Sequence, residues 1–247
     1  SLEPGDHVVT SELEHNSVSR PLRALEARGT SVTVVPCSPE GALDPSAVER
    51  ALRPETTLIV MTQASNVVGT ILPVREVAAV ARTHGALLLV DGAQSAGALP
   101  VSMDDLEADL FAFTGHKALY GPTGTGGVVI GERVDPGRLQ PLMRGGTGSD
   151  SESAAQPDFR PDAFEAGTMN VVVLAGLEAA ARWLLEHGVD RLRAQEVSLG
   201  AERPESLLAL LAKDAPPRLE GARLERPGGL VEAQAHGGEA ERGGVLG

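Results

Sequence analysis

Short apolar runs alternate with amphipathic segments along most of the chain. Six runs have the β-branched or leucine-rich pattern of strands: residues 7–10, 31–35, 57–61, 86–90, 109–113 and 127–131. Helical spacing fills the longer gaps between them. One helix is expected to begin at Asp44-Pro45, and another to begin after Pro73 and end at Gly85.

This alternation predicts an α/β fold, a three-layer α/β/α domain with a mainly parallel sheet and helices on both faces. The last two predicted strands lie too close in sequence for a crossover, so we predict that they pair antiparallel. A polar loop over residues 144–161 leads to a long apolar helix over residues 171–186. We predict one domain over residues 1–198.

The composition changes near residue 199. Residues 201–247 contain no Phe, Tyr, Trp, Ile or Thr, the residue types that favour strands. We predict that residues 199–247 form an atypical tail rich in Gly, Pro and Arg, poorly ordered except for a helix over residues 202–211. A structured but divergent tail is the alternative.

Charge and cysteine content restrict the partners. The formal net charge of −13 argues against nucleic acid or an anionic membrane surface. No apolar run approaches the roughly 20 residues of a membrane span, and no signal peptide is recognisable. The single cysteine, Cys37, excludes an intrachain disulfide. We expect a cytoplasmic protein.

Lysine is rare in this chain, which draws attention to Lys117. Of the 21 lysine and arginine residues, Lys117 and Lys213 are the two lysines. Arginine keeps its proton at working pH, whereas a lysine can lose it and attack a carbonyl as a neutral amine. Lys117 also follows the predicted strand 109–113. We predict covalent chemistry there; a surface lysine in a glycine-rich turn is the alternative.

Three polar residues follow other predicted strands: His15, Asn66 and Asp91. Ligands of open α/β sheets bind outside the carboxyl ends of the strands, so we expect these residues and Lys117 to share one rim. Each also has an ordinary explanation. Asp91 and Asn66 can be turn formers or helix caps, and His15 can be a solvated loop residue.

The glycine-rich segment around Lys117 suits an anionic group, because Thr114, His116 and the backbone offer hydrogen-bond donors. The segment lacks the lysine-serine or lysine-threonine pair of a Walker A loop. Gly124-Thr125-Gly126 runs into a strand, where a dinucleotide-binding motif needs a helix. The whole set suits pyridoxal 5'-phosphate, whose aldehyde needs a lysine, whose phosphate needs donors and whose ring nitrogen needs a carboxylate.

The sequence resembles the class V, fold-type I pyridoxal-phosphate enzymes, and among them it is most similar to the cysteine desulfurases. The motifs that carry the resemblance are Glu14-His15, Ser65-Asn66-Val67-Val68-Gly69-Thr70, Asp91-Gly92-Ala93-Gln94, the run from Asp109 to Lys117 followed by Gly124-Thr125-Gly126, and Phe164-Glu165-Ala166-Gly167-Thr168. The resemblance spans roughly residues 4–197.

The resemblance implies roles for individual residues. Lys117 would hold the cofactor as a Schiff base, Asp91 would pair with its pyridine nitrogen, and His15 would stack on its ring. Gln94 and Asn66 would lie near the phenolic oxygen or the carboxylate of an amino-acid substrate. Lys117 and His15 are the catalytic candidates, and the reaction would convert L-cysteine to alanine and an enzyme persulfide.

Further roles concern the phosphate and the partner subunit. Thr114 and His116 would bind the phosphate of their own site. Thr168 would reach the phosphate of the partner's site, which implies a homodimer. No metal is expected.

The sequence also departs from the family. The family's catalytic cysteine lies far beyond the lysine, whereas Cys37 precedes it, so we interpret Cys37 as structural or incidental. The N-terminal part and the C-terminal small domain are not recognisable, which makes the predicted fold incomplete. We expect this chain alone to be inactive. A truncated, non-catalytic protein that keeps the cofactor-domain fold, or another class V aminotransferase or lyase, is the alternative.

Overall fold

The computed structural model describes residues 2–150 and 152–201. The described residues belong to one compact unit, Ser1–Ala201. The helix predicted over residues 202–211 and nearly all of the predicted tail lie outside the described residues. No helix of the described part is both long and apolar enough to cross a membrane.

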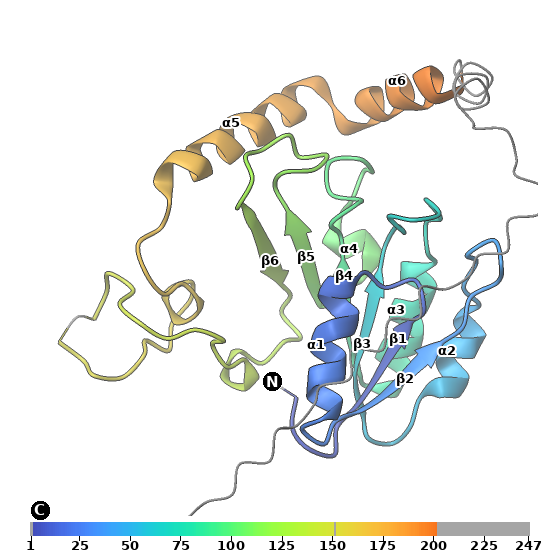
Figure 1. The fold of residues 1–247 in the computed structure, drawn as a ribbon, viewed down its shortest axis with the longest axis horizontal. Helices are drawn as coiled ribbons and strands as arrows, with labels where there is room; N and C mark the ends of the chain where they lie inside the picture. Colours follow the sequence, from blue (N-terminus) through green and yellow to red (C-terminus); the bar gives the residue numbers. More distant parts are fainter. Residues whose placement is uncertain (1, 151, 202–247) are drawn as a thin grey trace, which may run out of the picture. The chain divides into compact units, whose positions relative to one another are not determined.

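A six-stranded sheet with the strand order β2-β1-β3-β4-β5-β6 forms the centre of the fold (Figure 1). Its strands are β1 His7–Ser11, β2 Ser31–Val35, β3 Thr56–Thr62, β4 Leu87–Asp91, β5 Leu110–Thr114 and β6 Gly126–Ile130. Strands β1 to β5 pair in parallel, and β6 pairs antiparallel with β5. The predicted mainly parallel sheet and its antiparallel last pair are therefore confirmed.

The helices are α1 Asn16–Glu26, α2 Pro45–Ala51, α3 Val74–His84, α4 Met103–Leu106, α5 Val171–His187 and α6 Val189–Ala201, with 3-10 turns η1 Pro136–Arg138 and η2 Asp162–Phe164. The side chain of Asp44 caps α2 by accepting from the Ser46 N–H, and Gly85 ends α3 in the left-handed conformation. Both boundaries agree with the prediction. Helices α4 and α6 were not predicted from the sequence.

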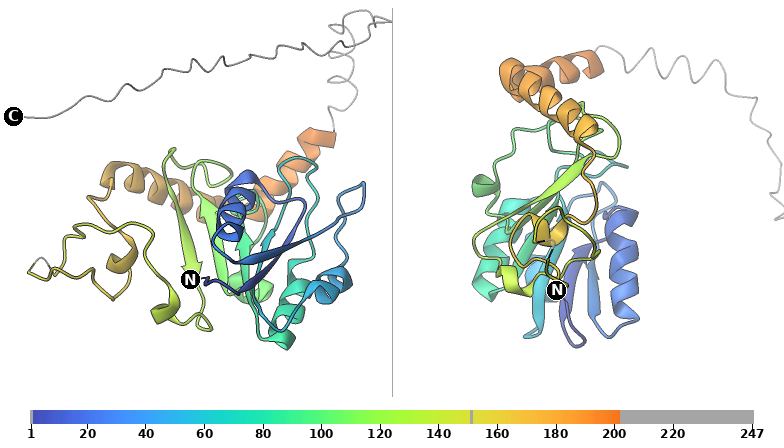
Figure 2. Two further views of the ribbon diagram at one scale, coloured as in Figure 1. Left: turned by 60° about the horizontal axis from the view of Figure 1, so that its bottom comes forward. Right: turned by 90° about the vertical axis from the view of Figure 1, so that its left-hand side faces the viewer.

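The two faces of the sheet carry separate cores, as expected when side chains alternate along each strand. On one face, Val8 of β1 and Val60 of β3 pack against Leu22 of α1. On the other, Val9 packs in a larger cluster that includes Val77 of α3. Figure 2 (right) shows α1 and α3 on opposite sides of the sheet. Burying each such side chain stabilises the fold by about 1.5–3 kcal/mol, so the alternating pattern fixes which face each strand residue takes.

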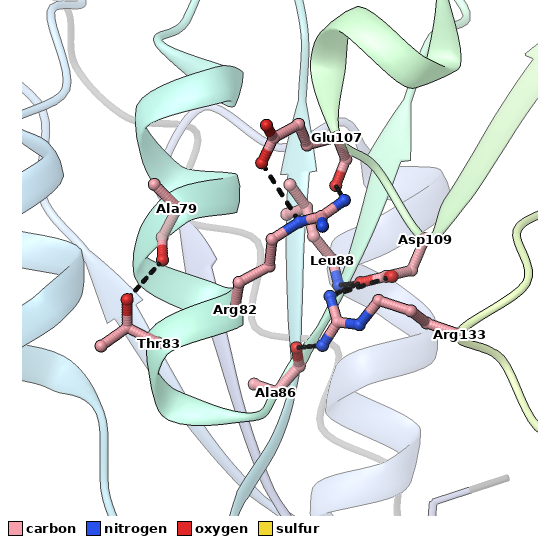
Figure 3. Close-up of polar contacts among 8 residues, drawn as sticks. All are labelled: Ala79, Arg82, Thr83, Ala86, Leu88, Glu107, Asp109 and Arg133. Carbon is pink, nitrogen blue, oxygen red and sulfur yellow. Dashed lines mark hydrogen bonds and ion pairs between the residues drawn. The ribbon is translucent and has the colours of Figure 1, made fainter.

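A polar network around Asp109 and the half-buried Arg133 joins the amino ends of β4 and β5 (Figure 3). The Asp109 carboxylate, whose side chain is 3% exposed, accepts from the Leu88 N–H at 2.7 Å and pairs with Arg133 at 3.1 Å. Arg133 also donates to the Ala86 carbonyl at 3.2 Å. Each charged group therefore has partners, and the network fixes where both strands begin.

Candidate active site

Asp91 is the last residue of β4, at the carboxyl end of the parallel sheet. It lies beside Thr62 of β3 in the strand register, on the face that α1 covers. Asp91 is 9% exposed, and its Oδ1 accepts a hydrogen bond from the Ala93 N–H at 2.9 Å. The bond to Ala93 closes a tight turn directly after the strand, which holds the carboxylate at the rim of the sheet.

A cleft of about 400 Å³ opens between α1 and the sheet at this position. Asp91, Ala93 and Thr114 line it from the strand ends, and Ser17 and Val18 line it from the first turn of α1. Its remaining lining is largely apolar, with Leu58, Val60, Leu89 and Phe113 from the sheet among it. A mostly apolar cavity with a few polar groups at one end is typical of cofactor sites. Two of the predicted site residues, Asp91 and Thr114, thus share one cavity.

Lys117 lies in the loop that connects β5 to β6. The Thr114 hydroxyl and His116 Nδ1 are hydrogen-bonded at 2.8 Å, and the Gly115 N–H donates to the Thr125 carbonyl at 2.9 Å. The Lys117 carbonyl accepts from the Tyr120 N–H at 2.9 Å. The loop is therefore held by its own backbone, with the side chains of His116 and Lys117 exposed.

The Lys117 loop packs directly on the turn that follows Asp91. Gly97 has a φ of 84°, and a Cβ at this position would lie 2.3 Å from the Ala118 carbonyl oxygen. Only glycine permits this approach. Gln94 lies in the same turn and is half-buried. The structure thus brings together the segments that carry Asp91, Gln94 and Lys117.

His15 and Asn66 occupy turns at the carboxyl ends of β1 and β3. His15 is exposed and caps α1, because its Nδ1 accepts from the Ser17 N–H at 3.2 Å. Asn66 is exposed in a turn closed by a hydrogen bond from the Gly69 N–H to the Ser65 carbonyl. Neither side chain lines the cleft beside Asp91. Their roles toward a cofactor stay predictions.

Thr168 lies in a different part of the fold. The segment before α5 is tied to the loop at residues 144–150 by a 2.7 Å bond from the Gly167 N–H to the Gly146 carbonyl. This part of the chain, yellow in Figure 1, runs beside β6 and away from the carboxyl ends of β1, β3 and β4. Thr168 is exposed there. No hydrogen bond between the described residues joins Thr168 to the Lys117 loop.

Glu14 is a further residue of this end of the sheet that sequence reasoning named only as part of a motif. Its Oε1 accepts from the Ser11 hydroxyl at 2.6 Å and from the Thr62 N–H at 3.0 Å. Its Oε2 is buried and has no hydrogen-bond partner. Burial raises the pKa of Glu14 to about 7, and the negative charge of Asp91 adds to this effect. The Ser11-x-x-Glu14 spacing directly after a buried strand is the signal that could have drawn attention to it.

Cys37 follows β2, three strands from β4 in the sheet order. With neighbouring strands about 4.8 Å apart, this places it about 14 Å from the Asp91 strand. Burial raises the pKa of its thiol, and Glu12, which accepts from the Cys37 N–H at 2.7 Å, raises it further. Both features disfavour a reactive thiolate at this position.

The fold and the polar rim define an α/β protein with a cofactor-type cleft at the carboxyl ends of its strands. The sequence profile of the aminotransferase class-V family matches residues 1–214, and the chain belongs to this family. It is 38% identical over 200 residues to a protein of Methanothermobacter thermautotrophicus named "Probable cysteine desulfurase", covering 80% of this chain and 50% of the relative.

Solved structures show the same similarity. The apo cysteine desulfurase from Thermococcus onnurineus NA1 matches with a TM-score of 0.74 and 34% identity, covering 85% of this chain and 52% of that one. A structure of SspA in complex with cysteine matches with a TM-score of 0.62 and 30% identity, covering 72% and 47%. The present chain therefore spans about half the length of the relatives it matches.

Proposed function

We propose that this chain forms the cofactor-binding part of a pyridoxal-phosphate-dependent cysteine desulfurase. One observation carries the proposal: the Asp91 turn and the Lys117 loop pack together through Gly97 and Ala118, beside a cleft that Asp91 lines. The similarity to cysteine desulfurases supports this function over that of a non-catalytic protein with the same fold.

The residues at the rim fit the cofactor chemically. Asp91 offers a fixed carboxylate for a protonated ring nitrogen, because its turn is closed by Ala93. Thr114 and His116, already hydrogen-bonded to each other, offer donors for a phosphate. The exposed Lys117 amine is free to bond to an aldehyde. When bound, pyridoxal phosphate supplies an electron sink for the bonds around the substrate α-carbon.

L-Cysteine is the proposed substrate, as the complex of the relative SspA with cysteine supports for this chain. The reaction breaks the bond between the substrate Cβ and sulfur and passes the sulfur to a thiol, giving alanine and a persulfide. Cys37 is a poor acceptor of this sulfur, because the pKa of its thiol is raised and it lies three strands from β4. We therefore assign the acceptor thiol to another group.

The assembly is part of the same proposal. Thr168 is exposed, which fits a residue that serves the partner's site in a homodimer. His15, Asn66 and Gln94 are proposed to contact the cofactor or substrate when the site is complete. A cytoplasmic location is proposed with it.

The position of the cofactor can be tested by reduction with borohydride. The full chain is incubated with pyridoxal phosphate, reduced, digested and mapped by mass spectrometry. We expect the label on Lys117, and Lys213 serves as an internal control because it is the other lysine of the chain. Lys117→Arg should remove the label without unfolding the protein. A label confined to Lys213, or none on folded protein, would contradict the proposal.

Activity is tested separately by sulfide release from L-cysteine. We expect this chain alone to release no more sulfide than free cofactor does, because Cys37 is poorly placed and its thiol pKa is raised. Cys37→Ala should behave like the unchanged chain. Turnover that Cys37→Ala abolishes would identify Cys37 as the acceptor and refute our assignment.

A further inference from the structure

Glu14 is a half-buried residue whose carboxyl group carries one fully buried oxygen and has no compensating cation among the described residues. None of the ion pairs among the described residues includes it. Both of its hydrogen bonds, from the Ser11 hydroxyl and the Thr62 N–H, go to Oε1. Oε2 is sealed from solvent without a partner. An ionised carboxylate would leave charge on this bare oxygen, whereas a protonated one carries its hydrogen there and accepts through Oε1.

The titratable groups that face Glu14 also favour its neutral form. Asp91, at the end of β4, is negatively charged when ionised and acts on Glu14 directly. Cys37, in the loop after β2, also interacts with Glu14, and its thiol becomes negative when it loses its proton. Negative charge on either neighbour therefore adds to the effect of burial, which is the main cause that disfavours the ionised form of Glu14.

Glu14 directly precedes the residue that starts α1. The His15 carbonyl accepts from the Val18 N–H at 2.9 Å and from the Ser19 N–H at 3.0 Å, and the His15 ring caps Ser17. A bond from the Thr62 N–H to Glu14 therefore ties the start of α1 to the end of β3, the strand next to Asp91.

We propose that Glu14 is a positioning residue that holds the His15 turn against the end of β3, and that it does so as a neutral carboxylic acid. The contact between Glu14 and Thr62, which joins the start of α1 to the end of β3, is here called the Glu14 seam. Loss of the proton places an uncompensated charge in this seam, so the Glu14 side chain leaves the seam and the His15 turn loosens. This inference rests on the proposed function only for the role of His15 toward the cofactor. The seam itself is a property of the chain without cofactor.

The protonation state can be read at the Thr62 amide, which donates to Glu14. In the full chain without cofactor, we expect the Thr62 amide chemical shift to titrate with a midpoint near pH 7 rather than near 4.5. Glu14→Gln, which mimics the neutral acid, should abolish this titration. Glu12→Gln is the matched control on an exposed neighbour and should retain it. A midpoint near 4.5, or a titration that persists in Glu14→Gln, overturns the proposal.

The positioning role can be read by hydrogen exchange at Val18 and Ser19, whose amides donate to His15. Corrected for intrinsic rates, their protection should fall about tenfold between pH 6 and pH 8, the factor expected one unit above the Glu14 midpoint. Glu14→Gln should keep its protection at both pH values, and Glu12→Gln should behave like the unchanged chain. An equal fall in Glu14→Gln assigns the effect to His15 or another group and overturns the proposal.

Pyridoxal phosphate affinity separates this inference from the proposed function. If the chain binds the cofactor, its Kd should rise severalfold from pH 6 to pH 8, and less in Glu14→Gln. A Kd that rises equally in both overturns the positioning role. If neither protein binds the cofactor while the Thr62 titration and the exchange difference hold, the proposed function fails and the Glu14 seam stands.

Discussion

The two ends of the parallel sheet differ in whether their buried polar groups have hydrogen-bond partners. At the amino end, Asp109 has both a backbone N–H and Arg133 as partners, and both ring nitrogens of His7 are hydrogen-bonded to threonine hydroxyls. At the carboxyl end, three side-chain oxygens are buried without any partner, on Thr10, Glu14 and Gln63. The Thr57 hydroxyl, near the start of β3, is the exception at the amino end.

This difference indicates that the amino ends of the strands serve stability and the carboxyl ends serve function. A buried polar group without a partner destabilises a fold by about 1–3 kcal/mol, so such groups persist where they serve something other than stability. The paired groups at the amino end fix where the strands begin. The unpaired groups lie at the carboxyl ends of the strands, the end of an open α/β sheet at which ligands bind.

The largest expected effect is the loss of a paired group at the amino end. Asp109→Ala leaves Arg133 and the Leu88 N–H without their shared partner, and we expect about 3 kcal/mol of destabilisation. Denaturant unfolding of the full chain measures it. Asp104→Ala, on an exposed acid of α4, is the control and should change stability by less than about 0.5 kcal/mol. Equal effects of the two substitutions would remove the contrast between the ends.

The next effect concerns Glu14 and pH. Its pKa is raised on folding from 4.5 to about 7, so the folded state binds its proton more tightly than the unfolded state does. The resulting stability is present below about pH 4.5 and is lost as pH rises through 7. Between pH 5.5 and 8.5 the unfolding free energy should fall by about 2 kcal/mol more in the unchanged chain than in Glu14→Gln. If the unfolding free energies of the two proteins changed equally with pH, the pKa of Glu14 would not be raised on folding, which would contradict the prediction.

Asp91 should affect binding far more than stability. Asparagine at this position can still accept from the Ala93 N–H, so Asp91→Asn should change unfolding by less than about 0.5 kcal/mol. It removes the charge that we propose faces the ring nitrogen, and pyridoxal phosphate should bind at least about tenfold more weakly. Asp105→Asn, on α4, is the control, and absorbance titration measures the affinity. An unchanged affinity would remove Asp91 from the cofactor site.

The smallest effect separates the two ends by matched substitutions. Thr10→Val replaces an unpartnered hydroxyl with a methyl group and should stabilise the protein by about 1 kcal/mol. Thr56→Val, at the amino end, removes a hydroxyl that is bonded to His7 and the Arg53 N–H and should destabilise it by about 1 kcal/mol. Thermal unfolding of both variants gives the signs. Two changes of the same sign would contradict the comparison.

Much of the fold could be predicted from the sequence because its signals are local. Alternation places all six strands, and the Asp44 cap and Gly85 mark helix ends by chemistry that needs no tertiary context. Helix α6 was missed because its sequence has only a weak apolar stripe, so nothing local distinguishes it from the polar segments around it.

The site was predictable only in outline. The strand ends predicted that Asp91 and Lys117 lie on one rim, and the structure places both after the carboxyl ends of neighbouring strands. The contact between Gly97 and Ala118 could not be predicted, because it depends on the path of two loops that lie about twenty residues apart in the sequence. The burial of Glu14 was missed for a similar reason: the sequence shows an acid after a strand, and only the packed seam shows that one of its oxygens is sealed in.

The register between β3 and β4 has a consequence for engineering this protein. Thr62 and Asp91 are neighbours because the parallel pairing of β3 with β4 runs from Leu58 and Leu87 to this pair without a register shift. Deleting one residue within β4 would turn Asp91 toward the opposite layer, and no rotamer change could restore it. Insertions in the long segment between β6 and α5 leave this ladder intact. Grafts and chimaeras should therefore exchange whole strand–loop units and place their junctions outside the ladder.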